Sequence, residues 1–441
     1  MTLTTRKKKH CVHIITFGCS ANTSSSEIMA GLLREAGFSI VDAAGRADII
    51  VVNTCTVKQR TENRVAALIK RLSGINKMLI VAGCMPEVQA GLIRSIAPRA
   101  ALLGTHHVRD IARLATRLIA DENHNPADGG NSSLTGRRHE SKLQLPKIRK
   151  NTAIAIVQIS QGCLGECSYC IVRLARGRLH SYPIKDIVAE VKTALSEGCR
   201  EIWLTSQDCA AYGIDTGTDL AELLRAVTAV RGSFRVRIGM MNPSTLKPIA
   251  GKLIRAYRSR KAFRFIHIPV QAGNNRILKA MNRQYTAAGF KQLVNKFRMS
   301  FPMITLSTDI ICGFPGEDNA EFGDSLELVK ETRPDIVNIS RFWPRPGTRA
   351  EEMYREHKIE GNITKKRSQE LSGLVRGIAL ENNRRWLGKS CVVLVDEHGK
   401  GAWVGRNIAY KPVVIRRHSK LKPGDFCRVK IAGAKGRYLE A

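Results

Sequence analysis

The chain of 441 residues has few aromatic side chains, few acidic side chains and no long apolar run. Aromatic residues make up 5% of it, so the composition does not suggest a flat platform on which many bases stack. A membrane helix needs about 18 consecutive apolar residues. Since no run reaches that length, we expect no membrane span. The basic amino terminus is not followed by the apolar stretch of a signal peptide, so we expect a cytoplasmic protein.

Acidic residues are also scarce relative to basic ones. The chain has 38 Asp and Glu against 71 Lys and Arg, which gives a formal net charge of +33. Such an excess favours a polyanionic partner, because cations that neutralise phosphates release counterions. We therefore expect a nucleic acid partner; the alternative is a basic surface that is simply solvated.

Three of the 12 cysteines lie close together in the segment Q-G-C-L-G-E-C-S-Y-C. Cys163, Cys167 and Cys170, the central set, have the spacing C-x3-C-x2-C. Closely spaced thiolates suit zinc, copper(I) or an iron–sulfur cluster. Three ligands are one fewer than a closed 4Fe–4S cluster uses, so one iron would stay open to a small ligand. A structural zinc knuckle with a distant fourth ligand is the alternative.

Three further cysteines, Cys19, Cys55 and Cys84, form the N-terminal set. Each follows an apolar run of strand character and precedes a helical pattern; the runs are Cys11–Phe17, Asp48–Val52 and Met78–Ala82. Alternating strands and helices predict a parallel sheet, whose ligands lie beyond the carboxyl ends of the strands. We therefore expect these cysteines to converge as a second cluster site, the alternative being three unrelated core cysteines. Ser24 and Glu27 have the spacing of a capping box before one of the helices.

The pattern divides the chain into an α/β domain at residues 8–120, a polar linker at 121–150, an α/β segment at 151–380 and a β-rich tail at 381–441. A helical face is expected at Ile184–Leu195. Six strands with intervening helices predict a partial (β/α) barrel whose strand-end loops form the active face. These strands are expected at Ala153–Ile159, Glu201–Thr205, Phe234–Ile238, Phe263–Val270, Ile304–Ile311 and Ile336–Phe342.

The tail has short β-like runs that predict a small β-barrel, preceded by a charged, helix-like segment at residues 349–385. Residues 384–441 hold 14 basic and 4 acidic side chains, a net charge of +10. Its basic cluster contains Arg416, Arg417, Lys420 and Lys422, which we expect to bind RNA; a solvated surface is the alternative. The β-like runs are Ser390–Val395, Gly401–Val404, Lys411–Ile415 and Phe426–Ile431.

The two cysteine sets, taken with other motifs, resemble the methylthiotransferase family of radical S-adenosylmethionine (SAM) enzymes over nearly the whole chain. The motifs are A-R-G, S-Y-P, E-I-W-L-T-S-Q-D, H-I-P-V-Q, T-D-I-I-C-G-F-P-G-E and P-R-P-G-T. V-N-T-C-T-V-K and E-I-W-L-T-S are most similar to the archaeal and eukaryotic branch, which acts on N6-threonylcarbamoyladenosine in tRNA. The resemblance implies an α/β fold: an N-terminal parallel-sheet domain, a partial (β/α) radical-SAM barrel and a small β-barrel similar to the TRAM domain.

The resemblance also implies two 4Fe–4S clusters, SAM and a tRNA partner. The central set would hold the cluster that cleaves SAM to a 5′-deoxyadenosyl radical. The N-terminal set would hold the cluster that carries the sulfur, giving a 2-methylthio product beside the anticodon. An electron donor and a sulfur source are implied too, and the sequence identifies neither. The remaining cysteines match no ligand position and are interpreted as structural: Cys11, Cys199, Cys209, Cys312, Cys391 and Cys427.

Contacts to SAM follow from the resemblance as well. Gln207, after the second barrel strand, is expected near the SAM amino group, and Gln271, after the fourth, near the ribose. Gly313 is expected near the adenine; ordinary loop contacts and a turn glycine are the alternatives. Arg176 in A-R-G could meet a phosphate, the SAM carboxylate or only a surface carboxylate. His267, inside an apolar strand, is interpreted as a core histidine.

Two other functions remain open. One is the sister activity on an aspartate of a ribosomal protein, which the basic tail disfavours. The other is a non-catalytic RNA-binding protein with structural metal sites. Structural metal sites are normally closed by four ligands, so two sets of three cysteines argue against it.

Overall fold

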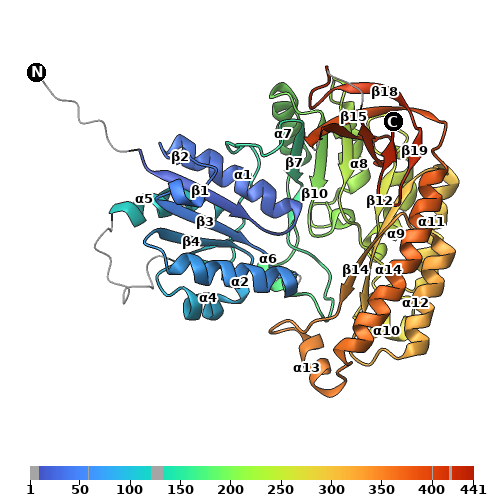
Figure 1. Ribbon diagram of the computed structural model, residues 1–441, viewed down its shortest axis with the longest axis horizontal. Helices are drawn as coiled ribbons and strands as arrows, with labels where there is room; N and C mark the ends of the chain where they lie inside the picture. Colours follow the sequence, from blue (N-terminus) through green and yellow to red (C-terminus); the bar gives the residue numbers. More distant parts are fainter. Residues whose placement is uncertain (1–8, 58, 121–132, 400, 417–419) are drawn as a thin grey trace, which may run out of the picture. The chain divides into compact units, whose positions relative to one another are not determined.

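The computed structural model describes residues 9–57, 59–120, 133–399, 401–416 and 420–441 (Figure 1). The chain forms two compact units, one of residues 1–150 with 171–177 and one of residues 151–170 with 178–441. Within the described ranges, no helix is long and apolar enough to cross a membrane.

The first unit is built on a six-stranded parallel sheet in the order β2-β1-β3-β4-β5-β6. The three predicted strands are confirmed as β1, β3 and β4, each within two residues of its expected ends. Their apolar residues alternate between the two faces, so each face has its own buried core. The strands are β1 (Cys11–Thr16), β2 (Ser39–Ile40), β3 (Ile49–Thr54), β4 (Met78–Gly83), β5 (Ala101–Gly104) and β6 (Ser133–Leu134).

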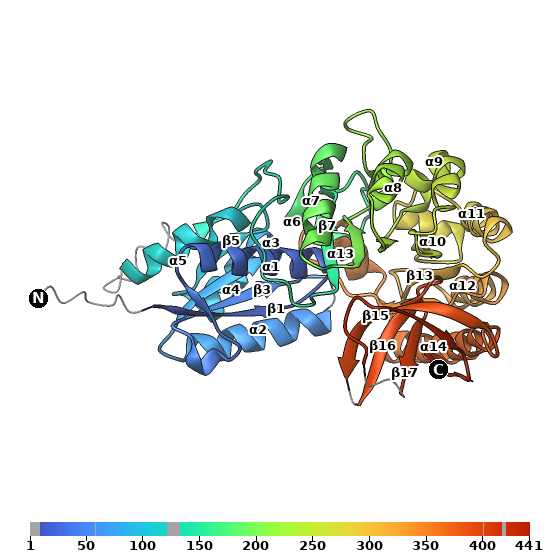
Figure 2. The ribbon, with the colours of Figure 1, turned by 90° about the horizontal axis from the view of Figure 1, so that it is seen from above.

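Helices cover both faces of this sheet (Figure 2). Helices α1 and α5 pack on one face, and α2 and α4 pack on the other. The helices are α1 (Ser20–Glu35), α2 (Gln59–Ser73), α3 (Met85–Val88), α4 (Ala90–Ile96), α5 (Ile111–Ala120) and α6 (Ile171–Arg176), with 3-10 turns at Ala44–Arg46 and Val108–Asp110.

Two expectations for this unit need revision. The capping box at Ser24 and Glu27 is wrong, because α1 begins at Ser20 and both residues lie inside it. Glu27 instead accepts a hydrogen bond from the Lys150 amide at 3.0 Å. The part of the expected linker that is described, residues 133–150, supplies β6 and packs against α1. A Cβ atom on Gly31 would lie 2.2 Å from the carbonyl oxygen of Pro146.

The second unit begins with the six predicted barrel strands, all of which are present. They form two parallel sheets in the orders β11-β10-β7 and β12-β13-β14. Parallel bridges from Val236 to Ala262 and from Met240 to His267 continue the curved wall between the sheets. The strands are β7 (Ile154–Gln158), β10 (Glu201–Thr205), β11 (Arg235–Ile238), β12 (Phe265–His267), β13 (Thr305–Cys312) and β14 (Ile336–Arg341), with a small ladder of β8 (Ser160–Gln161) and β9 (His180–Ser181).

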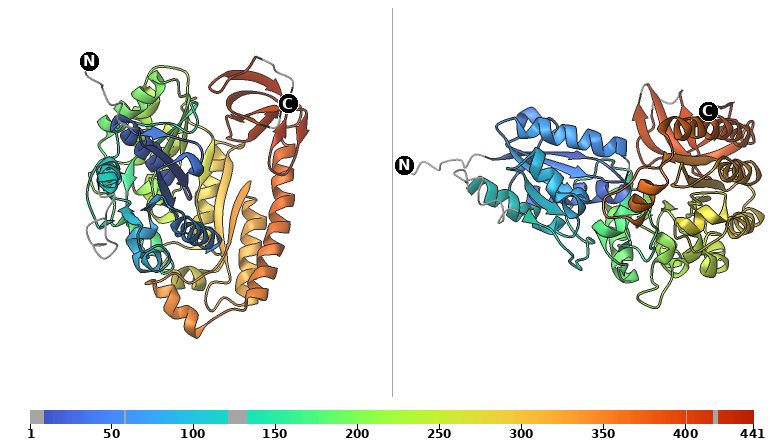
Figure 3. Two further views of the ribbon diagram at one scale, coloured as in Figure 1. Left: turned by 60° about the vertical axis from the view of Figure 1, so that its left-hand side comes forward. Right: turned by 90° about the horizontal axis from the view of Figure 1, so that it is seen from below.

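Helices alternate with these strands, and α7 begins at Ile184 as expected. The charged segment after β14 forms two helices, and the long α14 runs beside β14 and α12 (Figure 3). The helices are α7 (Ile184–Ser196), α8 (Leu220–Ala229), α9 (Pro243–Ala256), α10 (Asn275–Ala280), α11 (Ala287–Ser300), α12 (Asn319–Thr332), α13 (Arg349–Glu356) and α14 (Gly361–Arg384), with a 3-10 turn at Cys209–Ala211.

The tail forms a curled six-stranded sheet in the order β18-β15-β16-β17-β20-β19. The four predicted runs are confirmed as β15 to β18, and two very short strands were not predicted. A bulge between Val395 and Glu397 lets the long β15 bend and pair with two neighbours. The strands are β15 (Ser390–Gly399), β16 (Ala402–Asn407), β17 (Pro412–Ile415), β18 (Phe426–Lys430), β19 (Gly433–Ala434) and β20 (Leu439–Glu440).

Candidate metal centres

The central set lies on the loop that follows β8. The Gly165 amide donates a hydrogen bond to Sγ of Cys163 at 3.2 Å. A Cβ atom on Gly165 would lie 3.4 Å from Sγ of Cys163 and 3.7 Å from Sγ of Cys167. A side chain at this position would contact both sulfur atoms, and glycine leaves them free of that contact.

The electrostatic environment of Cys163 favours the protonated thiol when no metal is bound. Burial raises the pKa of this thiol to about 12, and the carboxylate of Asp208 and the thiolates of Cys170 and Cys167 add to the rise. A metal ligand must lose its proton. Metal binding at this set is therefore expected to release protons.

The loop of the central set is fastened to the end of α10 and to the start of α13. The Ser168 amide donates to the carbonyl of Met281 at 3.1 Å, and its hydroxyl donates to the carbonyl of Ala280 at 3.0 Å. The side chain of Asn282 donates to the carbonyl of Glu166 at 2.7 Å. These bonds fix the backbone that presents the cysteines. The Ser168 carbonyl also accepts from the Ala350 amide at 2.9 Å.

The N-terminal set lies at the carboxyl edge of the first sheet, as predicted. Cys19 precedes α1, Cys55 follows β3 and Cys84 precedes α3, so the set follows three neighbouring strands, β1, β3 and β4. Gly18 has a φ of +109°, and a Cβ atom there would lie 2.7 Å from that of Cys55. Only glycine allows the backbone next to Cys19 to approach Cys55 this closely.

The thiols of the N-terminal set affect one another. Burial raises the pKa of the Cys55 thiol to about 11, and the negative charges of Cys84 and Cys19 contribute to the rise. The same deprotonation that metal binding requires would leave several negative charges close together, two of them on the buried Cys55 and Cys84. Nearby cations would stabilise them.

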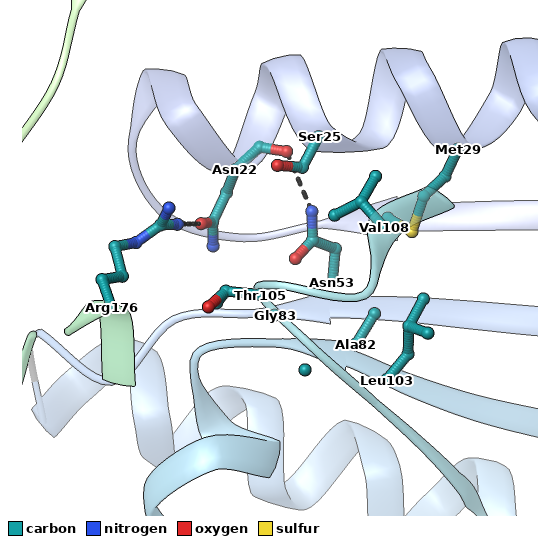
Figure 4. A pocket seen from close by; sticks show the side chains of 11 residues that line it. Asn22, Ser25, Met29, Asn53, Ala82, Gly83, Leu103, Thr105, Val108 and Arg176 are labelled. Atoms are coloured by element: carbon teal, nitrogen blue, oxygen red, sulfur yellow. Dashed lines mark hydrogen bonds between the residues drawn. The ribbon is translucent and has the colours of Figure 1, made fainter. Parts of the chain in front are cut away.

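Arg176 supplies one such cation. Its Nη2 donates to Oδ1 of Asn22 at 2.7 Å, and Figure 4 shows the guanidinium directed at that side chain. Burial alone would lower the pKa of Arg176, but the thiolates of Cys84 and Cys19 outweigh burial and raise it. Of the roles considered from sequence, the surface carboxylate is wrong, because Arg176 is buried beside the N-terminal cysteines.

Asn22 and Asn53 fix the backbone around these cysteines. Asn22 donates from Nδ2 to the carbonyls of Phe17 and Thr54, both at 2.8 Å. Asn53 donates from Nδ2 to the carbonyl of Asn22 at 2.8 Å, the second bond drawn in Figure 4. The pocket that both asparagines line with Arg176 has a volume of about 10 Å³, close to the minimum for one water molecule.

Lys142 is a second buried cation near this set, and sequence reasoning missed it. Its Nζ donates to the carbonyl of Thr105 at 2.7 Å. Burial lowers the pKa of Lys142 to about 7, and the thiolates of Cys84 and Cys19 oppose the decrease. The residue lies in the polar stretch expected to be a linker, so local sequence gave no signal for it.

The described part of the chain has no group of three His, Cys, Asp or Glu side chains arranged to hold one metal ion. Thiols of a cluster bind different irons and need not meet at one point. Each set brings three thiols to one loop or to one sheet edge beside a glycine, and this set of soft donors fits an iron–sulfur cluster.

The expected SAM residues make contacts within the protein. Gln207 accepts the Gly162 amide at 2.8 Å through Oε1 and so holds the start of the central loop. Gln271 has a φ of +74°, a left-handed conformation that is uncommon outside glycine. Gly313 has a φ of +75°, and a Cβ atom there would lie 2.0 Å from Thr364 of α14. The close approach predicted at Gly313 is therefore made by the protein's own helix.

The other candidates differ in their surroundings. His267 is paired through Nε2 with Oδ1 of Asp309 at 2.8 Å, which agrees with a satisfied histidine. Arg416, Lys420 and Lys422 are exposed on the tail. Nη2 of Arg416 lies 3.5 Å from Oε1 of Glu440, as an ion pair. Arg417 lies outside the described residues.

Three family models match successive parts of the chain. They are "Uncharacterized protein family UPF0004" at residues 11–104, "Radical SAM superfamily" at 157–329 and "TRAM domain" at 384–441. The N-terminal set falls within the first match, the central set within the second and the basic cluster within the third.

Relatives match at nearly full length. A probable threonylcarbamoyladenosine tRNA methylthiotransferase of Methanothermobacter thermautotrophicus is 39% identical over 98% of this chain and 99% of its own. The threonylcarbamoyladenosine tRNA methylthiotransferase of Xenopus laevis is 34% identical over 97% of this chain and 76% of its own.

Solved structures of radical SAM enzymes share the fold at low identity. The methyltransferase TsrM of Kitasatospora setae, with tryptophan and a SAM analogue bound, has a TM-score of 0.57 and 12% identity over 84% of this chain and 89% of its own. The cobalamin-dependent radical enzyme OxsB has a TM-score of 0.52 and 12% identity over 81% of this chain and 56% of its own.

Proposed function

The chain belongs to the threonylcarbamoyladenosine tRNA methylthiotransferase family of radical SAM enzymes, and from this premise we propose that it converts N6-threonylcarbamoyladenosine beside the anticodon of tRNA to the 2-methylthio derivative. The observation that carries the proposal is the presence of two separate three-cysteine sets in a chain that aligns with such a relative over 98% of its length.

The chemistry of the substrate explains why two sets are needed. Carbon 2 of adenine bears an unactivated hydrogen. A polar substitution of that hydrogen by sulfur would require it to leave as hydride, which is a poor leaving group. The cofactors of this family, two 4Fe–4S clusters and SAM, supply radical cleavage and the methylthio sulfur, while the protein positions the parts.

We assign the SAM-cleaving cluster to Cys163, Cys167 and Cys170. Gly165 leaves room beside the thiols, and Gln207 holds the loop start through its bond to Gly162. The open iron of a three-cysteine cluster is the position at which SAM would bind, which makes incomplete coordination a functional requirement.

We assign the sulfur-carrying cluster to the N-terminal set. Arg176 and Lys142, which are both buried, would balance part of the negative charge of its thiolates. A charge buried without a partner costs several kcal/mol. The two cations are therefore expected to stabilise the cluster-bound form.

The tRNA would be bound partly by the basic tail, through Arg416, Arg417, Lys420 and Lys422. Contacts of this kind position the RNA without reading its sequence. We place the reaction in the cytoplasm, where thiols stay reduced, with an electron donor and a sulfur source that are separate molecules.

Nucleoside mass spectrometry of tRNA from a deletion strain tests the proposal. The 2-methylthio nucleoside should be absent and its unmodified precursor should accumulate, and the wild-type gene should restore the product. An unchanged tRNA nucleoside profile together with loss of a modified ribosomal-protein aspartate would instead support the sister activity.

A further inference from the structure

Arg283 lies at the central cysteine set, although it belongs to a distant part of the sequence. Its Nη1 donates to Sγ of Cys167 at 2.8 Å. Sequence reasoning gave no sign of this contact, because 116 positions separate the two residues. The contact joins a cation directly to one of the three thiols.

The backbone around Arg283 is fixed by the same contacts that hold the cysteine loop. Its amide donates to the carbonyl of Leu278 at 2.8 Å, which ends α10. The preceding Asn282 has a φ of +54° and bonds the loop at Glu166. Ser168 bonds the same turn through the carbonyls of Met281 and Ala280. These hydrogen bonds therefore hold the cysteine loop against the backbone from which the Arg283 side chain extends.

The guanidinium is also held in orientation. Its Nε donates to the hydroxyl of Tyr285 at 2.7 Å, and the guanidinium lies 5.0 Å from the centre of that ring. The Tyr285 hydroxyl in turn donates to the carbonyl of Val270 at 2.9 Å. Nη2 donates to the carbonyl of Pro269 at 3.4 Å, and these contacts together orient the planar group with Nη1 toward Cys167.

An acidic side chain lies near another cysteine of the set. Asp208 acts on Cys163, and its carboxylate accepts hydrogen bonds from the Ala210 and Asn242 amides and the Thr245 hydroxyl. The set therefore has a buried, hydrogen-bonded acidic group near Cys163, whose pKa burial raises, and a fixed cation at Cys167. Hydrogen bonds to cluster sulfurs and nearby charges set the reduction potentials of such clusters.

We propose that Arg283 is a positioning residue that raises the reduction potential of the cluster held by the central set, through its hydrogen bond to Cys167. Electron density on that sulfur is withdrawn toward the guanidinium, so the reduced state is stabilised. The inference rests on the proposed function only in that the central set holds the SAM-cleaving cluster.

The test compares R283Q, R283K and Y285F with the wild-type enzyme after anaerobic reconstitution. R276Q is the matched control, because Arg276 is a nearby arginine, on α10, that bonds Glu321 and Gly316 and not a cysteine. Iron content, the midpoint potential from a redox titration followed by electron paramagnetic resonance and the rate of 5′-deoxyadenosine formation are measured for each variant.

We expect R283Q to retain iron. The equilibrium constant for one-electron reduction of its cluster should fall about tenfold, which lowers the midpoint potential by about 59 mV. The rate of 5′-deoxyadenosine formation should fall by about 10- to 100-fold, as for other groups that support metal ligands. R283K should recover part of the midpoint potential and part of the rate, because it keeps the positive charge. Y285F should give values between those of R283Q and the wild type. The control R276Q should match the wild type in both measurements.

An unchanged midpoint potential in R283Q at full iron content would overturn the proposal. If R283Q loses iron, R283K and Y285F decide: wild-type potentials in both would show that Arg283 has only a structural role. A variant with Cys163, Cys167 and Cys170 all replaced by Ala shows which paramagnetic resonance signal belongs to the central set, because that signal should be absent from its spectrum. Survival of the titrated signal there would refute the cluster assignment itself.

Discussion

Lys411 of the C-terminal sheet donates from Nζ to Oδ1 of Asp335 at 2.6 Å, and both side chains are 7% exposed. Asp335 precedes the barrel strand β14, and its other oxygen accepts the Leu306 amide at 2.8 Å. The ring centres of Phe263 and Phe265 also lie 4.9 and 5.0 Å from the ring centre of Tyr410. The C-terminal sheet is therefore packed on the barrel, and deleting it would expose apolar and charged groups of the barrel.

Replacing Lys411 by Met should destabilise the second unit by about 3–5 kcal/mol, because Asp335 would remain buried without its cation. Chemical unfolding followed by tryptophan fluorescence measures the loss. The double variant K411M/D335L should recover part of the stability. If the free energy of unfolding of K411M falls by less than about 1 kcal/mol, water must reach and solvate the Asp335 carboxylate, which would contradict this prediction.

Glu201 predicts a pH dependence of stability. Burial raises the pKa of this carboxyl to about 7, and the nearby Asp396 adds to the rise. The unfolded chain then ionises at lower pH than the folded one, so this residue should lower stability as the pH rises from about 4.5 to 7. The loss is about 3 kcal/mol at most.

Unfolding of the wild type and E201Q from pH 5.5 to 8 measures this effect. The difference in stability should grow in favour of E201Q up to about pH 7 and then level off. Parallel pH profiles for the two proteins would mean that Glu201 is ionised in the folded state.

The exposed cations of the tail should contribute RNA affinity. Because the sheet that carries them is packed on the barrel, the variant R416A/K420A/K422A is a better test than truncation. Each lost phosphate contact should reduce the slope of log affinity against log salt by about one unit. Filter binding of tRNA across a salt series measures the slope.

The control K291A/K330A removes exposed lysines of α11 and α12 that pair with Glu331 and Glu327. It should leave the slope unchanged. Equal slopes for the tail variant and the wild type would mean that the basic cluster is only a solvated surface.

Replacing Arg176 by Met should impair the N-terminal set selectively. Asn22 would lose its donor, and the thiolates would lose a buried cation. We expect methylthio product to fall by about 10- to 100-fold, while 5′-deoxyadenosine formation by the central set persists. R176K should restore little, because lysine cannot bond Asn22 with the same planar geometry. Equal loss of both products would contradict the selectivity.

Much of the fold and the places of the six cysteines in it could be predicted from sequence, because strand patterns and cysteine spacing are local signals. Cys19, Cys55 and Cys84 each follow a recognisable strand, and a parallel sheet brings the ends of such strands to one edge. Arg283 could not be found in this way, because its partner Cys167 lies on a loop far along the chain. Lys142 was missed because polar composition resembles a linker even where the chain is packed.

The capping box failed for a different physical reason. Ser24 and Glu27 have the correct spacing, but the N-cap of α1 is Cys19, five residues before Ser24, and the helix starts at Ser20. The position of a helix start is decided there by the turn that follows β1, in which Gly18 approaches Cys55. A local motif cannot report such a tertiary constraint.

The division of roles between the two cysteine sets is tested most directly by one assay. The variant with Cys19, Cys55 and Cys84 all replaced by Ala is reconstituted, and 5′-deoxyadenosine and methylthiolated tRNA nucleoside are quantified from the same reaction. About half of the roughly eight irons should remain if both clusters are 4Fe–4S. Reductive formation of 5′-deoxyadenosine should continue without any methylthio product, whereas the corresponding variant of the central set should form neither. Normal yield of the methylthio nucleoside from the first variant would contradict the sulfur-carrying role of the N-terminal set.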